Sequence, residues 1–240
     1  MRVRVRLFAI LRERAGLDEV EVELPDGATT EDALAALAER DGLTELIERM
    51  PLAVAVNRDY ATRERPLADG DEIALIPPVS GGAGPRSPEG DPIHAAVVDG
   101  PISADALTKS VVRPAAGAAV TFQGTTRDVD RLDYEAYREM AEQRIASILA
   151  EVVGRHGLEA AAAEHRVGAV PLGEASVVVA VSAAHREEAF AGAREAIDRI
   201  KAEAPIWKRE VRAAADGERG EWVEGTLPAE PTPPPARADR

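Results

Sequence analysis

The chain has 240 residues, 45% of them hydrophobic, which is enough for two modest domains with a core each. Its formal net charge of -14 argues against general binding to nucleic acid or anionic membranes, because both need a basic surface. No apolar run approaches the ~20 residues that span a bilayer, and residues 1–10 alternate charged with aliphatic side chains instead of forming a signal peptide. We therefore expect a cytoplasmic protein without nucleic-acid or membrane partners.

The chain contains no cysteine, which excludes disulfides, thiolate metal sites and any persulfide carried on a cysteine. The four histidines, His94, His156, His165 and His185, do not have metal-ligand spacing, so we expect neither a metal site nor a cofactor. A G-x-x-x-x-G-K loop is also absent, so ATP chemistry would belong to a partner.

The N-terminal part predicts a small domain that mixes strands with one helix. Aliphatic residues alternate with arginines at the start, which indicates a half-buried strand, and Glu19 to Leu24 predicts a second one. Thr29 and Asp32 have capping-box spacing, and the apolar stripe that follows predicts a helix that fades near Gly42. Two further strands are expected, at 52–56 and 72–76. This order is that of a β-grasp fold, although other small α+β domains share it.

The sequence PPVSGGAGPRSPEGDP then interrupts all periodicity and is typical of an exposed linker. The last residues, from Pro228, are rich in proline and predict a disordered tail. The chain is therefore divided into a domain at 1–82, a linker at 83–92, a second domain at 93–227 and a tail at 228–240.

The second domain predicts an α/β arrangement. A strand is expected at Ala118 to Phe122, then a helix with apolar residues at helical spacing around 145–153, then a buried strand at Ser176 to Val181. A final helix should begin near His185 and end before Pro205, because the residue before proline is pushed out of the α region. Its buried face is expected to carry Phe190, Ala193, Ile197, Ile200 and Ala204.

Lysine is rare in this chain: of 29 lysines and arginines, only Lys109, Lys201 and Lys208 are lysine. Unlike arginine, lysine can exchange a proton when neighbours and burial lower its pKa, so Lys201 and Lys208 are candidate catalytic groups. A plainer explanation of Lys201 is a cation at a helix C-terminus, and spacing alone slightly favours it. Lys208 follows Trp207, which indicates either a lysine held against an aromatic wall or a surface lysine lying over a core tryptophan.

Three cationic residues are candidate anion ligands. His185 and Arg186 stand at a strand-to-helix junction, where free backbone N–H groups favour anions. Arg127 follows a strand in FQGTTRD, where Gly124 permits an unusual turn and a guanidinium could bind phosphate with two hydrogen bonds. Each of these also fits an ordinary exposed position.

The sequence Ser80-Gly81-Gly82 follows the last strand of the first domain and has almost no side chains. Such a segment suits the threading of a backbone carbonyl into a narrow active site, although an ordinary linker contains glycines too.

The two halves resemble the two subunits of molybdopterin synthases. Residues 1–82 resemble the small, sulfur-carrying subunit in LFAILRERAG, LPDGATTEDALAALAER and AVNRDYATRERPLADGDEIALIPPVSGG. Residues 93–225 resemble the large subunit in four blocks that occur in its order, VTFQGTTRD, LDYEAY, EHRVGAVPLGEASVVVAVSAAHREEAF and IDRIKAEAPIWKRE. The resemblance implies an α+β protein in which a ubiquitin-like β-grasp carrier precedes an α/β catalytic domain.

The resemblance also implies a reaction. In this family a separate enzyme adenylates the terminal glycine of the carrier, which becomes a thiocarboxylate, enters the large subunit and transfers sulfur to cyclic pyranopterin monophosphate. A carrier of this kind needs no cysteine. By resemblance, Gly81 and Gly82 form the carrier end and Lys201 and Lys208 are the catalytic lysines.

Substrate binding and assembly follow from the same resemblance. It assigns Arg127, His185 and Arg186 to the anionic pterin. The family's large subunit forms a homodimer whose sites draw on both protomers, so His185 and Arg186 are candidates for the neighbour's site.

The sequence departs from the family pattern in two places. Arg127 is followed by Asp128-Val129-Asp130, an acidic stretch where the family has polar residues. The diglycine is internal here, so Gly82 has no carboxylate to activate unless a protease cuts after it.

Three interpretations of the chain remain. The leading one is a synthase that is cut after Gly82. The alternative is an uncut protein whose ubiquitin-like domain only binds or scaffolds while separate carriers deliver sulfur. A third, a large half without catalysis, is disfavoured because the candidate lysines and cationic substrate ligands are all present.

Overall fold

The computed structural model describes residues 1–38, 43–44, 47, 50, 52–77, 92–214 and 217–223. These residues form two compact units, which meet in the sequence between Pro77 and Pro92. Gly81, Gly82, residues 83–91 of the expected linker and the expected tail lie outside the described residues. None of the helices in the described part is both long and apolar enough to cross a bilayer.

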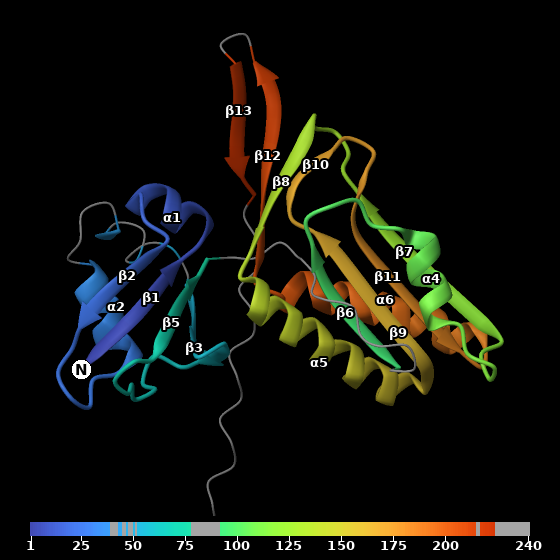
Figure 1. The fold of residues 1–240 in the computed structure, drawn as a ribbon, viewed down its shortest axis with the longest axis horizontal. Coiled ribbons are helices and arrows are strands. Elements are labelled where there is room, and N and C mark those ends of the chain that lie inside the picture. The colour runs from blue at the N-terminus through green and yellow to red at the C-terminus, as the bar shows by residue number, and fades with distance from the viewer. Residues whose placement is uncertain are drawn as a thin grey trace, which may run out of the picture. The chain divides into compact units, whose positions relative to one another are not determined.

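The described part of the N-terminal unit forms a five-stranded mixed sheet accompanied by the helices α1 and α2 (Figure 1). The sheet has the strand order β2-β1-β5-β3-β4, in which only β1 and β5 are parallel. Its elements are β1 (Arg2–Leu7), α1 (Ala9–Ala15), β2 (Glu19–Glu23), α2 (Thr30–Ala38), β3 (Ala53–Val56), β4 (Asp59–Ala61) and β5 (Glu72–Ile76). The β-grasp prediction is confirmed.

The alternation in β1 determines which of its faces is buried. Val3, Val5 and Leu7 lie in the core with at most 1% of their surface exposed, because successive side chains of a strand point to opposite faces. On the other face, Arg2 forms an ion pair with Glu23 of β2.

The capping box of α2 is confirmed. The backbone N–H of Thr29 donates to Asp32 Oδ2 at 2.7 Å, and the backbone N–H of Asp32 donates to Thr29 Oγ1 at 3.4 Å. The predicted end near Gly42 lies outside the described residues.

Two short elements of this unit were not predicted. Helix α1 has only seven residues, too few for a periodic pattern, and it ends at Gly16, whose φ of 67° is left-handed. Strand β4 has three residues and pairs with β3.

The C-terminal unit contains two four-stranded sheets, with the orders β6-β9-β11-β7 and β10-β8-β12-β13. Its strands are β6 (Ile93–Val98), β7 (Ala118–Thr125), β8 (Arg131–Ala136), β9 (Leu158–Arg166), β10 (Gly168–Pro171), β11 (Ala175–Ala183), β12 (Ile206–Ala214) and β13 (Gly217–Trp222). Its helices are α4 (Ala104–Val111), α5 (Arg138–His156) and α6 (Arg186–Glu203). The α+β class is confirmed.

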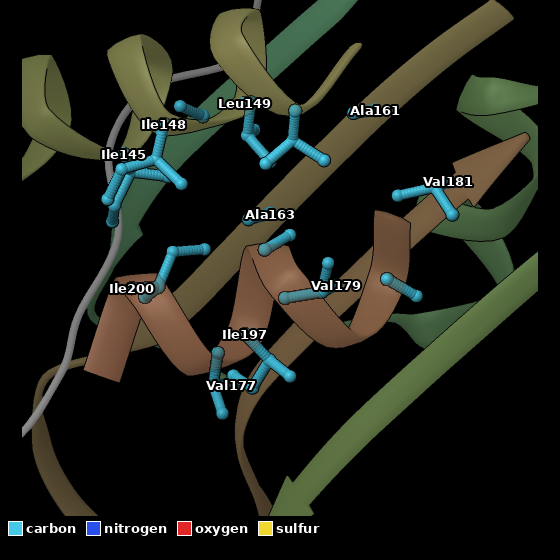
Figure 2. Packing of buried hydrophobic residues seen from close by; sticks show 14 of the residues in the cluster. Ile145, Ile148, Leu149, Ala161, Ala163, Val177, Val179, Val181, Ile197 and Ile200 are labelled. Carbon is cyan, nitrogen blue, oxygen red and sulfur yellow. The ribbon is translucent and has the colours of Figure 1, made fainter. Parts of the chain in front are cut away.

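The first of these sheets is covered on both faces. Helices α5 and α6 pack on one face, where isoleucines and leucines of the helices meet valines and alanines of β9 and β11 (Figure 2). Helix α4 covers the other face through Leu107 and Val111, which contact Ala160 and Ala162 of β9. The run of alanines in β9 suits a strand between two helical layers, because small side chains let both approach closely.

Helix α6 confirms the predicted boundaries and corrects one residue of its buried face. His185 is the N-cap, and Ala204 adopts an extended conformation with ψ 132° before Pro205. Phe190, however, is 63% exposed, and Ala189 is buried instead. The expected stripe was therefore wrong by one position at its N-terminal end.

Candidate functional site

Lys201 and Lys208 lie on either side of a single bend. Lys201 is in the last turn of α6, and Lys208 is the third residue of β12. Between them the chain turns at Pro205, whose carbonyl accepts a hydrogen bond of 3.1 Å from the backbone N–H of Tyr137. The bend is thus anchored to the start of α5.

The register of β12 determines the direction of Lys208. Lys208 is directly opposite Tyr134 of β8, so the two side chains share one face of their sheet. Trp207 is opposite Glu135 and points to the other face, because neighbouring residues of a strand alternate. Trp207 is therefore neither an aromatic wall for Lys208 nor a core tryptophan beneath it, which were the two alternatives stated from the sequence; the aromatic residue opposite Lys208 is Tyr134.

Tyr134 connects the two sheets of this unit. Its hydroxyl donates to Ser176 Oγ on β11 at 3.1 Å, and the Ser176 hydroxyl donates to the carbonyl of Gly124 on β7 at 3.1 Å. Its ring makes an edge contact with the His165 ring of β9, with 4.7 Å between the centroids. Burial raises the pKa of the Tyr134 phenol, against a smaller opposing effect of the bond to Ser176, so the phenol is neutral at physiological pH.

Lys201 approaches the same region from the helix. Its Nζ lies 5.5 Å from the centroid of the Phe122 ring on β7, within the range of a cation–π interaction. Gly124 lies two residues further along β7. A Cβ at this position would lie 2.7 Å from Val177 Cγ1, which is too close, so the absence of a side chain at Gly124 makes room for Val177. His165 is the partner of Val177 on its other side, so it belongs to the same sheet face.

His165 is a buried histidine beneath the two lysines, with 3% of its surface exposed. Burial is the main cause that lowers its pKa to about 3; the charges of Lys201 and Lys208 contribute to the shift, and a hydrogen bond to the Arg166 carbonyl opposes it. Both lysine charges therefore act on the same ring, Lys208 from the face that it shares with Tyr134 and Lys201 from its position over Phe122. Lys201 is exposed and Lys208 is half-buried, so the pair forms a cationic site over a floor of Phe122, Tyr134 and His165.

Arg127 lies at the lysine end of β7, in the loop that follows this strand. Its side chain is 88% exposed. The loop is held by buried Thr126, whose backbone N–H donates to the Glu174 carbonyl at 3.0 Å and whose carbonyl accepts from the Gly173 N–H at 2.9 Å. A fixed backbone thus presents an exposed guanidinium, which suits the binding of an anion from solvent.

The two acidic neighbours of Arg127 differ in position. Asp130 Oδ2 accepts a hydrogen bond of 2.7 Å from the Ala213 backbone N–H of β12, so this carboxylate is engaged by the hairpin. Asp128 is 84% exposed and has a left-handed φ of 62°, and its carboxylate lies 3.8 Å from the Arg127 guanidinium. Only Asp128 therefore stands directly beside Arg127.

His185 and Arg186 are not brought to this site within one chain. They stand at the start of α6, and the 15 residues from Arg186 to Lys201 correspond to about 22 Å of helix. The pairing of Ala118 with Ala183 places this junction at the far end of β7 from Arg127. Both side chains are exposed.

The last turn of α6 is also fixed by ion pairs to α5. Glu203 accepts hydrogen bonds from Arg144 of α5 and from Arg199, whose Nε lies 2.7 Å from Glu203 Oε1. Two turns earlier, Glu195 has a similar arrangement with Arg155 and with His156, whose Nε2 lies 2.7 Å from Glu195 Oε2.

Comparison with known proteins identifies both units. Residues 97–203 match the family model described as MoaE protein, and residues 5–82 match that of the ThiS family. The molybdopterin synthase catalytic subunit of Oryza sativa subsp. indica is 53% identical over 103 residues, which are 40% of this chain and 53% of that protein. That of Thermoplasma volcanium is 47% identical over 117 residues, which are 46% of this chain and 85% of that protein.

A solved structure of molybdopterin synthase from Staphylococcus aureus has 33% sequence identity and a TM-score of 0.49, and the match covers 53% of this chain and 94% of that one. The chain spans about half the length of the rice relative.

The fold and the matches define a carrier-type β-grasp unit joined in one chain to the catalytic-subunit domain of a biosynthetic enzyme. The chain belongs to the family of molybdopterin synthase catalytic subunits. The resemblance stated from the sequence motifs is confirmed.

We predict that Glu203 stabilises the bend between the lysines. Although burial alone would raise the pKa of Glu203, its bonds to Arg199 and Arg144 outweigh this effect and lower it. Its stabilisation is therefore present above the pKa of an unfolded glutamate and lost as pH falls through the lowered folded-state value. Glu203→Gln should cost about 1 kcal/mol in urea unfolding at pH 7, since the partners are partly exposed, and progressively less as the pH falls through the lowered pKa of Glu203.

Glu195→Gln is the matched control. It should cost a similar amount, but only Glu203→Gln should speed amide hydrogen exchange across residues 200–208. Equal exchange in the two variants would contradict a specific role of Glu203 at the bend.

Proposed function

We propose that this protein is a molybdopterin synthase that transfers sulfur from a thiocarboxylate on Gly82 to cyclic pyranopterin monophosphate and so builds the dithiolene. The observation that carries the proposal is the convergence of Lys201 and Lys208 over the floor formed by Phe122, Tyr134 and His165. Family membership supplies the reaction class.

The chemistry of the transfer explains a use for two lysines. The thiocarboxylate sulfur forms a bond to a carbon of the pterin that carries oxygen, the carbon–oxygen bond breaks, the oxygen substituent leaves, and an acyl-thio adduct remains. Water then adds to the acyl carbon, the C–S bond breaks, sulfur stays on the pterin and Gly82 leaves as a carboxylate. Each acyl step develops negative charge on oxygen, so cations beside the terminal glycine stabilise the transition state.

The pterin is an anion, and the protein as a whole has a net charge of -14. A local cationic group must therefore overcome a repulsive field. In the proposal Arg127 binds the substrate in its own protomer, at the lysine end of β7. His185 and Arg186, about 22 Å away along α6, act in the site of a second protomer within a homodimer.

The carrier end must be made before it can be used. A peptide-bonded Gly82 has no carboxylate, so we propose that a protease cuts after it and that a separate adenylating enzyme then activates and sulfurates the new terminus. The requirement is chemical, because only a free terminus can become a thiocarboxylate. In the alternative, the carrier unit stays uncut and only binds or scaffolds.

The catalytic roles of the lysines can be tested directly. With a pre-thiocarboxylated carrier fragment, Lys201→Ala and Lys208→Ala should each lower product formation by ~10²–10³-fold, as loss of an oxyanion donor does. Arginine should rescue poorly, because it keeps the charge without exchanging a proton.

Lys109→Ala is the control, because Lys109 is exposed and its ion pair within the described residues is with Asp105 of its own helix. It should leave turnover unchanged. Near-normal turnover in both alanine variants at 201 and 208 would remove the catalytic assignment.

Sharing of the site between protomers predicts complementation. Lys201→Ala and Arg186→Ala should each be nearly inactive alone. After co-refolding of equal amounts, half of the dimers are mixed and each mixed dimer has one intact site, so about a quarter of wild-type activity should return. The control is a mixture of Lys201→Ala with Arg127→Ala. If Arg127 and Lys201 act in the same site of the same protomer, every site in this mixture lacks one of the two residues, so activity should not recover. No recovery in the first mixture would show that Arg186 does not serve the neighbour.

Cutting after Gly82 predicts a defined fragment. Intact mass measurement of protein from active native extracts should find an N-terminal fragment that ends at Gly82, and Gly82→Pro should block both cutting and activity. Ser87→Pro, in the same segment but away from the cut, is the control and should do neither. Active extracts that contain only the full-length chain would support the uncut alternative.

A further inference from the structure

The imidazole of His165 lies in the floor of the lysine site, and it has no role in the proposed reaction as described above. A buried polar side chain costs free energy unless it is hydrogen-bonded, so its presence under two cations calls for a physical explanation. The neighbouring alanines of the same strand, Ala161 and Ala163, show that apolar residues fill this face elsewhere.

The tautomer of His165 follows from its hydrogen bond. Its Nδ1 lies 2.9 Å from the carbonyl oxygen of Arg166, and a carbonyl can only accept. Nδ1 must therefore carry the proton. In the neutral ring Nε2 is then unprotonated and is a hydrogen-bond acceptor.

The surroundings hold the ring in one orientation. The edge contact with Tyr134 packs one side, and Tyr134 is itself fixed through Ser176 to the Gly124 carbonyl. Tyr134 also shares its sheet face with Lys208. Lys201 lies over Phe122 of β7. Phe122 and His165 belong to the sheet β6-β9-β11-β7 and lie on the same face of it. The imidazole thus stands between the elements that carry the two lysines.

We propose that His165 is a positioning residue for the lysine pair, in which the bond to Arg166 locks the ring so that its unprotonated Nε2, which has one lone pair, accepts from one lysine ammonium group at a time. A neutral acceptor can attract either ammonium group without adding a third positive charge or a competing carboxylate, either of which would change the charge presented to the acyl oxygen. The depressed pKa keeps the ring neutral throughout the physiological range.

This inference rests on the proposed sulfur transfer, and two isosteric variants separate it from a purely structural role. In His165→Asn the amide nitrogen occupies the place of Nδ1 and can still donate to the Arg166 carbonyl. The shorter asparagine side chain has no atom at the place of Nε2. In His165→Gln the terminal amide occupies the place of Nε2 and supplies an acceptor, but the bond to Arg166 is lost.

With the pre-thiocarboxylated carrier fragment, His165→Asn should lower kcat by about 10- to 100-fold without changing KM for the carrier, as expected for loss of a hydrogen bond to a charged group. His165→Gln should recover most of that loss. The melting temperatures should have the opposite order: His165→Asn should melt at a higher temperature than His165→Gln, since only His165→Asn retains the bond to Arg166. Equal kcat for the two variants, or recovery by Asn and not by Gln, would overturn the inference. An inactive wild type would instead contradict the proposed function itself.

A measurement on the uncut wild-type chain needs no activity. In ¹⁵N-labelled protein at pH 7, two-bond proton–nitrogen correlations should show His165 with a protonated Nδ1 and an unprotonated Nε2, with the signal assigned by its loss in His165→Asn. Lys201→Ala or Lys208→Ala should shift the Nε2 resonance, and Lys109→Ala should not. A protonated Nε2 in the wild type, or a resonance indifferent to both site lysines, would overturn the inference whatever the kinetic result.

Discussion

The bend at Pro205 is the constraint on which the lysine site depends. A helix and a strand cannot present residues seven positions apart to one point unless the chain turns between them, and proline forces that turn by excluding the helical conformation at Ala204. The carbonyl of Pro205 is then tied to Tyr137, and Glu203 is tied to Arg144. Both anchors belong to the start and middle of α5, so the helix pair fixes the bend as well as the core.

The absence of cysteine connects the two units through chemistry. In the proposed reaction sulfur is carried on an acyl terminus, which needs no reactive side chain on the carrier. The proposed task of the catalytic unit is then to stabilise acyl oxygen charge and to bind an anion. Arginine supplies most of the positive charge of the chain, and lysine, which differs from arginine in its capacity to exchange a proton, occupies three positions.

Local sequence signals predicted the features that depend on neighbouring residues. The Thr29–Asp32 cap, the boundaries of α6 and the bend that follows it are of this kind. The floor of the site was missed because it depends on register: Tyr134 and Lys208 are far apart in the sequence and meet only when β8 pairs with β12. His165 carried no signal of its own, since it ends a strand of alanines that has no alternating pattern.

The length of α6 sets a limit on what one protomer can do. A straight helix of this length keeps its two ends about 22 Å apart, more than the reach of any side chain, so Arg186 and Lys201 cannot act on the same small substrate within one chain. In the proposed homodimer, a second copy of the helix start would supply Arg186 and His185 to the lysine end. Exposed Phe190 would gain free energy if a partner covered it, because it is a large apolar side chain. Helix α6 packs on its sheet along its whole length, through Ala189 near its start and Ile200 near its end, so only the face that carries Phe190 is left for such a contact.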